Sequence, residues 1–162
     1  MTDTQTETAL AEGDIAPDFT LPQDKGDPVT LSALRPKPVV LYFYPKDDTP
    51  GCTKQAVGFT TLKKEFEEAG GTILGVSKDS VAKHEKFRAK HDLGVALLSD
   101  AEGDVCERYG VWKEKNMYGK VYMGIERTTF LIDGSGKIAR IWPKVKVDGH
   151  MEDVLEALKA LG

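Results

Sequence analysis

Runs of apolar residues alternate with helical repeats along much of the chain. Val39 to Tyr44 form a continuous apolar run that stops at Pro45, which is typical of a buried central strand. Apolar residues then recur every three or four positions from Ala56 to Ala69, and Gly70-Gly71 follows, so the pattern predicts one amphipathic helix there. The same reasoning predicts strands at 72–77, 95–98, 128–132 and 138–142, helices at 80–91 and 149–161, a short helix or helical turn at 104–109, and a hairpin turn at 133–136. This order predicts an α/β fold in which helices flank a mixed central sheet.

The composition is that of a single globular domain. The chain has 162 residues, of which 40% are hydrophobic and 30% are charged. A chain of this length can bury a full core without disulfide or metal staples. Residues 1–12 are polar and acidic, so we expect a flexible N-terminal tail followed by one domain at 13–162.

Charge, hydropathy and ligand spacing exclude several kinds of partner. The net charge of −4 argues against a nucleic-acid binder that relies on overall positive charge. The N-terminus lacks the pattern of a secretory signal, and the longest apolar run is too short to span a membrane. We therefore expect a cytoplasmic protein with thiols at rest and no membrane partner. The two cysteines and three histidines show no zinc-ligand spacing, so we expect no metal and no cofactor.

The segment from Pro45 to Thr53 carries the chemistry suggested by the sequence. It joins the end of the central strand to the start of the longest helix, where α/β folds place ligands. Thr49 is a good N-cap and Pro50 a good first helical residue, which makes Cys52 the third residue of the helix. A capping box places an anion at that position, so the helix dipole and free N–H groups would stabilise a Cys52 thiolate. The alternative is a buried and inert cysteine.

These residues resemble a known family. Pro45, Thr49 and Cys52 form a P-x-x-x-T-x-x-C pattern that resembles the motif of peroxiredoxins, and TPGCTKQA resembles their bacterioferritin comigratory protein, or PrxQ, subfamily. Four further segments that follow the family's order are 13–21, 39–45, 109–112 and 127–133. The resemblance implies a thioredoxin-like fold of the peroxiredoxin type with an N-terminal extension.

The resemblance also implies a role for individual residues. Cys52 matches the peroxidatic cysteine, which attacks a peroxide oxygen and becomes a sulfenic acid. Thr49 matches the residue whose hydroxyl binds the peroxide and the sulfur, and Pro45 matches the ring that covers the site. Arg127 matches an arginine that points into the pocket from a distant strand, and Gln55 matches a residue beside that arginine. The enzyme would be a thiol-dependent peroxidase acting on hydrogen peroxide and organic hydroperoxides.

The chain departs from the family pattern in its resolving cysteine. Many PrxQ proteins have a second cysteine five residues after the first, where this chain has Val57. Others have it on the following helix, near Phe87 and Arg88. The remaining thiol, Cys106, has apolar neighbours and is expected to be a small buried hydrophobe rather than a resolving thiol. We therefore expect a one-cysteine mechanism, in which thioredoxin or another external thiol reduces Cys52.

Other functions are consistent with parts of the sequence. A redox sensor or chaperone-like protein would use the same cysteine without turnover. A thioredoxin-like disulfide reductase is disfavoured because the chain has no C-x-x-C. A cysteine hydrolase is disfavoured because no local motif supplies a histidine base. Relatives in the subfamily are often monomers, so we expect a monomer.

Overall fold

The structure, a computed structural model, describes residues 10–161. Nine strands and six helices are present in this part of the chain. In chain order they are β1 (Thr20–Leu21), β2 (Val29–Thr30), the 3₁₀ helix η1 (Leu31–Leu34), β3 (Val39–Phe43), α2 (Pro50–Thr61), α3 (Lys63–Glu68), β4 (Thr72–Ser77), α4 (Val81–His91), β5 (Ala96–Ser99), α5 (Val105–Arg108), β6 (Trp112–Met117), β7 (Lys120–Ile125), β8 (Thr128–Ile132), β9 (Ile138–Trp142) and α6 (His150–Leu161).

The central sheet has five strands in the order β5-β4-β3-β8-β9. β3, β4 and β5 are parallel, whereas β8 runs antiparallel to β3 and β9 antiparallel to β8. The predicted mixed sheet is therefore confirmed, and β3 is its middle strand with every residue buried. Phe43 at the end of β3 pairs with Thr128 at the start of β8. This register brings the residue before β8, Arg127, to the carboxyl end of β3.

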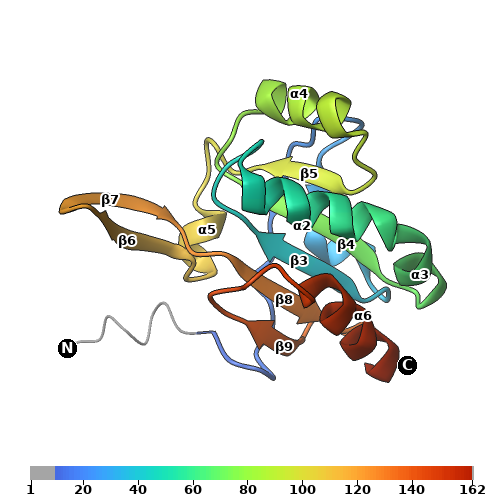
Figure 1. The fold of residues 1–162 in the computed structure, drawn as a ribbon. Coiled ribbons are helices and arrows are strands. Elements are labelled where there is room, and N and C mark those ends of the chain that lie inside the picture. Colours follow the sequence, from blue (N-terminus) through green and yellow to red (C-terminus); the bar gives the residue numbers. More distant parts are fainter. Residues whose placement is uncertain (1–9, 162) are drawn as a thin grey trace, which may run out of the picture.

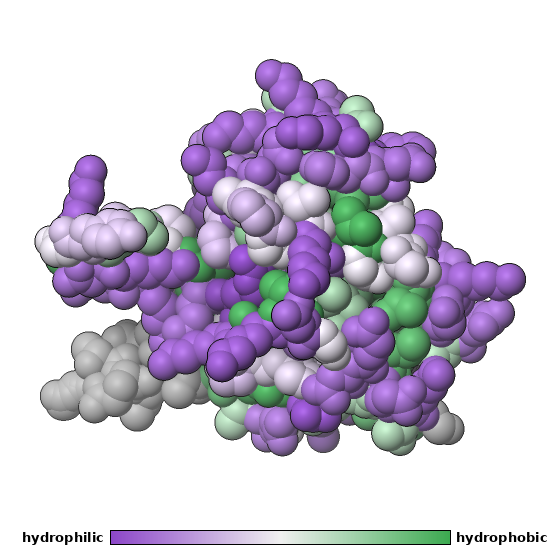
Figure 2. Space-filling view, viewed as in Figure 1, coloured by the Kyte–Doolittle hydropathy of each residue, from purple (hydrophilic) through white to green (hydrophobic). Residues whose placement is uncertain are grey.

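Two hydrophobic clusters cover the two faces of this sheet. Val39, Leu41 and Phe43 belong to one cluster, and Val40 and Tyr42 belong to the other, because neighbouring residues of a strand point to opposite faces. Helices α2, α3, α4 and α6 contribute buried residues to the second cluster. Figure 1 shows α2, α4 and α6 on the viewer's side of the sheet. Their outer surfaces are mostly hydrophilic, with smaller hydrophobic patches between them (Figure 2).

The single helix predicted up to Ala69 is wrong, because α2 and α3 are separated at Leu62. The hydroxyls of Thr60 and Thr61 donate to the carbonyls of Ala56 and Val57, four residues earlier. Threonine back-bonding of this kind bends helices. The predicted core-facing stripe holds across the break, because α2 and α3 both pack on the second cluster.

The sequence patterns missed the hairpin of β6 and β7. Within residues 10–161 these strands pair only with each other, and the hairpin projects from the body of the molecule (Figure 1). Most of its residues are exposed on both faces, so neither strand shows the alternation that marks a half-buried strand. The remaining predicted strands and helices are present, with ends that agree to within one residue.

The N-terminal segment contacts the domain through Leu10 and Glu12, before the boundary expected at residue 13. Residues 1–9 of the expected tail lie outside the described residues. Leu10 packs against the first hydrophobic cluster, and the Glu12 carboxylate accepts from the backbone N–H of Ile141. Across residues 10–161, no helix has the length and apolar character needed to cross a bilayer.

Candidate active site

The loop after β3 leads directly into the N-terminus of α2. Thr49 occupies the N-cap position with extended backbone angles, and Pro50 is the first helical residue. Cys52 is therefore the third helical residue, and only 1% of its surface is exposed. The Thr49 hydroxyl does not cap the helix, because it donates to the carbonyl of Lys46 at 2.8 Å. Its oxygen lone pairs remain oriented by that bond and can accept a further hydrogen bond.

Arg127 directly precedes β8 and reaches the N-terminus of α2 because β8 pairs with β3. Its Nη2 donates to the Cys52 sulfur at 3.4 Å, and its Nη1 donates to the Gln55 Oε1 at 2.8 Å. Gln55 is buried on α2, one turn after Cys52. A Cβ at Gly51 would lie only 3.0 Å from Nη2. The glycine before the cysteine therefore leaves the space that the guanidinium occupies.

A second cation lies close to Arg127. Lys115 of β6 donates from Nζ to the carbonyl of Ile125 at 2.5 Å. Burial lowers the pKa of Lys115, and the positive charge of Arg127 lowers it further. Pro45 is half-buried at the start of the loop. The structure thus brings Pro45, Thr49, Cys52, Gln55 and Arg127 to one end of the sheet, around the first turn of α2.

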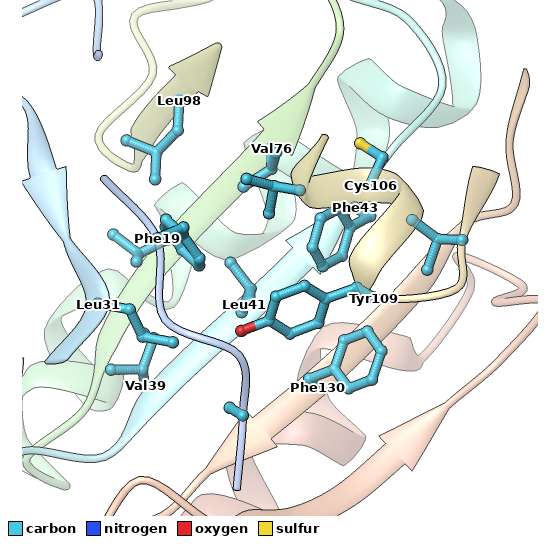
Figure 3. Packing of buried hydrophobic residues seen from close by; sticks show 14 of the residues in the cluster. Phe19, Leu31, Val39, Leu41, Phe43, Val76, Leu98, Cys106, Tyr109 and Phe130 are labelled. Carbon is cyan, nitrogen blue, oxygen red and sulfur yellow. The ribbon is translucent and has the colours of Figure 1, made fainter. Parts of the chain in front are cut away.

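Cys106 lies elsewhere. It belongs to the cluster on the opposite face of the sheet from Cys52, beside Phe43 and Tyr109 (Figure 3). Burial raises the pKa of the Cys106 thiol, and the charge of Asp100 raises it further. The Asp100 carboxylate also accepts from the backbone N–H groups at the start of α5. The sheet separates the two thiols, so a Cys52–Cys106 disulfide would require a large rearrangement.

A buried ion pair behind the loop was not singled out from the sequence. His84 of α4 has no exposed surface, and its Nδ1 lies 2.5 Å from the Asp47 Oδ2. Asp47 is part of the loop between Pro45 and Thr49. The signal available in the sequence was a carboxylate in the loop after one strand and a histidine on a later helix that packs on the same face of the sheet.

The arrangement is suited to nucleophilic chemistry by sulfur. The Cys52 sulfur faces a guanidinium at a helix N-terminus, where positive potential and donors favour an anion. The same guanidinium can donate to an oxygen bound beside the sulfur. Across residues 10–161, no cluster of three or more His, Cys, Asp or Glu side chains could hold a metal ion.

Known proteins with the same sequence features share the fold. The AhpC/TSA family profile matches residues 13–141. Peroxiredoxin Bcp of Bacillus subtilis (strain 168) is 50% identical over 147 residues, which cover 91% of this chain and 94% of the relative. A structure concerned with the alkyl peroxide reduction activity of the Xanthomonas campestris bacterioferritin comigratory protein is 48% identical, with a TM-score of 0.84, and covers 88% of this chain and 91% of that one. Two structures of X. campestris peroxiredoxin Q with one cysteine each replaced by serine, at positions 36 residues apart, also have a TM-score of 0.84 at 48% identity and cover 88–89% of this chain and 90–92% of those chains.

Proposed function

Because this chain belongs to the AhpC/TSA family and to its Bcp/PrxQ peroxiredoxins, we propose that it reduces hydroperoxides through a sulfenic acid on Cys52. The chain is a peroxidase of the oxidoreductase class. The Cys52 thiolate attacks the terminal oxygen of a hydroperoxide, an S–O bond forms, and the O–O bond breaks. The departing oxygen takes a proton and leaves as water or an alcohol, while sulfur is oxidised by two electrons.

The observation that carries this proposal is the 3.4 Å contact from Arg127 to the Cys52 sulfur. Negative charge moves from sulfur to the departing oxygen during the attack. A guanidinium beside the sulfur can donate to both, so it stabilises the charge wherever it develops. Gln55 holds the other side of the guanidinium and limits its movement.

Thr49 and Pro45 complete the proposed site. With its proton directed to the Lys46 carbonyl, the Thr49 oxygen is an acceptor for the O–H of a bound hydroperoxide. That bond would align the O–O bond with the sulfur, which is the main benefit of a preorganised site. The half-buried Pro45 ring limits the access of water to the first turn of α2.

The surroundings of Cys52 support a one-cysteine cycle. The interval of 36 residues between the two serine variants of the X. campestris protein, counted from Cys52, leads to Arg88. Arg88 donates to Asp24 and to the carbonyl of Val95, so this position is part of the packing of α4. With Cys106 behind the sheet, the sulfenic acid is left for an external thiol. A first thiol forms a mixed disulfide and releases water, and a second thiol restores Cys52 and leaves as a disulfide.

The partners of this cycle are a hydroperoxide and a thiol donor, with thioredoxin or a small thiol as the reductant. A monomer in the reducing cytoplasm would suffice, because the proposed site is built from one chain. The alternative of a redox sensor or chaperone-like protein using Cys52 differs in turnover. With a reductant present, an enzyme consumes many equivalents of peroxide, whereas a sensor consumes one.

Mass spectrometry of the peroxide-treated protein tests the proposal. One equivalent of peroxide in the presence of dimedone, which traps sulfenic acids, is expected to give an adduct on the peptide that contains Cys52. Peroxide consumption is then followed with thioredoxin and its reductase, and separately with a small thiol. A Cys52–Cys106 disulfide as the first product would contradict the one-cysteine cycle, and consumption of a single equivalent would favour the sensor.

A further inference from the structure

The loop that carries Thr49 is held from behind by helix α4. Asp47 is buried within this loop, and its Oδ1 accepts from the Tyr44 hydroxyl at 2.6 Å. Its Oδ2 faces the Nδ1 of His84 at 2.5 Å. Its backbone N–H donates to the carboxylate of Asp79 at 2.8 Å. The middle of the loop is therefore fixed through three different side chains, of which only His84 comes from α4.

The contacts of His84 define its protonation state. Its Nε2 lies 2.9 Å from the carbonyl of Leu98, and its Nδ1 faces the carboxylate of Asp47. A carbonyl and an ionised carboxylate only accept hydrogen bonds, so these two partners favour a proton on each ring nitrogen. Burial on its own lowers the pKa of His84, but the hydrogen bond and charge of Asp47 outweigh it and raise the pKa above its ordinary value. His84 has no exposed surface, and its contacts favour the imidazolium form.

Asp47 is one residue away from the group that orients Thr49. The Lys46 carbonyl, which accepts from the Thr49 hydroxyl, belongs to the peptide unit that ends at the Asp47 nitrogen. Because a peptide unit is planar, a rotation of Asp47 would turn this carbonyl and release the hydroxyl. Asp48, the next residue, has a φ of 62° and accepts from Lys90 and His91 of α4. The loop is thus attached to α4 at two successive residues.

We propose that His84 is a positioning residue of the peroxide site, which acts through Asp47 and the Lys46 carbonyl to keep the Thr49 oxygen aimed at the substrate. The inference rests on the proposed function, because it needs Thr49 to bind the hydroperoxide. His84 does not touch the substrate or the sulfur. Its Nδ1 donor holds the loop, so loss of that donor lets the Thr49 oxygen move away from the substrate without removing any group that reacts.

Two substitutions separate the two hydrogen bonds of His84. The amide nitrogen of asparagine lies where Nδ1 lies, so His84→Asn keeps a donor to Asp47 and loses the one to Leu98. The amide nitrogen of glutamine lies where Nε2 lies, so His84→Gln keeps the donor to Leu98 and leaves Asp47 without a partner on α4. Lys86→Gln is the matched control, because it removes one positive charge from an exposed position of the same helix.

The readout is the rate of reaction with peroxide divided by the rate of alkylation by iodoacetamide. Both reactions need the Cys52 thiolate, so the ratio cancels its ionisation, and only the peroxide needs Thr49. We expect His84→Gln to lower the ratio about tenfold, the scale of a small misplacement of a reacting group. His84→Asn and Lys86→Gln are expected to stay within about twofold of the original protein on the same scale. Equal losses in His84→Gln and His84→Asn, or no loss in either, would overturn the proposal.

The pH dependence gives a test that needs no folded His84→Gln variant. Because the folded pKa of His84 is raised, the ring loses its second proton only as the pH rises through that folded pKa, above the ordinary histidine value of about 6.5. The proton that remains is favoured on Nδ1, which faces the carboxylate, so neutral His84 keeps the donor to Asp47 and loses the one to Leu98. The groups facing His84 are Asp47 from the loop, Tyr44 directly after β3, Asp79 before α4 and the Leu98 carbonyl of β5. Lys83 of α4 lies 3.9 Å from Asp79.

The rate ratio of the original protein is therefore expected to stay within about twofold as the pH rises through the folded pKa of His84. His84→Asn should show the same pH dependence, because it also keeps only the donor to Asp47. Lys115, which lies near Arg127, titrates in both proteins and cancels in the comparison. A ratio that falls with pH in the original protein but not in His84→Asn would show that the charge of His84 holds the loop instead of its Nδ1 donor, and would contradict the proposal. Failure of the proposed function is seen separately, as the absence of a Cys52 sulfenic acid in the original protein.

Discussion

The two cysteines are equally buried but have opposite electrostatic surroundings. Cys52 lies in the first turn of a helix on one face of the sheet and receives a hydrogen bond from the Arg127 guanidinium. Cys106 lies on the other face, and the carboxylate of Asp100 raises the pKa of its thiol in addition to burial. Burial alone therefore does not distinguish the thiol proposed to react from the other one. The sign of the nearest charge does, because a cation beside sulfur favours an anion and a carboxylate disfavours it.

The largest expected difference between the two cysteines is in turnover. Cys52→Ser should reduce peroxide consumption to the background rate, because a serine hydroxyl does not reduce peroxide. Cys106→Ser should keep nearly all of the activity with an external thiol, because Cys106 has no contact with the site. Steady-state peroxide consumption measures both, and near-ultraviolet circular dichroism checks that both variants are folded. A loss of turnover in Cys106→Ser, with sulfenic acid accumulating on Cys52, would make Cys106 the resolving thiol.

Arg127→Gln should lower the rate of reaction with peroxide by about 100-fold, the usual effect of removing one donor to a developing oxyanion. A low thiol pKa is not enough for a fast reaction. A fall of about 2.5 units raises the thiolate fraction about 13-fold at pH 7.4, but reduced nucleophilicity costs about tenfold. Arg127 is therefore expected to act mainly on the transition state.

Alkylation by iodoacetamide distinguishes the two roles of Arg127. It requires the thiolate but no peroxide pocket, so its rate should change much less than the peroxide rate in Arg127→Gln. Equal losses in the two reactions would show that the guanidinium only favours the thiolate. The difference between the two cysteines would then reduce to ionisation alone.

Local sequence patterns predicted the position of Cys52 at the start of α2, but they did not predict the long-range contact of Cys52 with Arg127. The apolar run that became β3 and the placement of Thr49, Pro50 and Cys52 at the start of α2 depend on residues next to one another. Arg127 is 75 residues from Cys52, and the two meet because Phe43 pairs with Thr128. The spacing of apolar residues along the chain does not reveal which residues of two distant strands pair with each other. The resemblance to peroxiredoxins supplied the arginine instead.

The sequence patterns missed three features of the structure, each for a different physical reason. The break at Leu62 arises from threonine hydroxyls that bond to the preceding turn, which a hydrophobic stripe does not reveal. The β6–β7 hairpin has no buried face along most of its length, so its pattern resembles a loop. The Asp47–His84 pair joins residues 37 positions apart, and each of them alone is typical of a solvated polar residue.

Alkaline pH should reveal the surroundings of Cys106 as a change in stability. Because the folded pKa of Cys106 is raised, its neutral thiol contributes stability that is complete below the unfolded pKa of about 8.5 and is lost as the pH rises towards the folded value. Between pH 8 and pH 10 this loss amounts to about 2 kcal/mol. Cys106→Ala should lack it, so its free energy of unfolding should approach that of the original protein as the pH rises.

Denaturant unfolding of the reduced proteins at a series of pH values measures this difference. The comparison with Cys106→Ala removes the contribution of the buried tyrosines, which also lose stability at alkaline pH because burial raises the pKa of Tyr42 and Tyr109. A constant difference between the two proteins from pH 8 to pH 10 would mean that Cys106 ionises normally. The electrostatic contrast with Cys52 would then be lost.

The smallest effect concerns the residue that holds the guanidinium beside Cys52. Gln55 accepts from Arg127 through Oε1, while its buried Nε2 has no hydrogen-bond partner among residues 10–161. Gln55→Met keeps a side chain of similar length and removes the acceptor, so Arg127 gains freedom to turn away from the sulfur. We expect the peroxide rate to fall about fivefold, which is about 1 kcal/mol and the usual worth of one hydrogen bond. Val57→Met is the control, because Val57 is exposed on the same helix and should leave the rate unchanged. A rate that falls equally in both variants would indicate a general effect on α2. An unchanged rate in Gln55→Met would mean that the pairing of β8 with β3 places Arg127 beside Cys52 without help from Gln55.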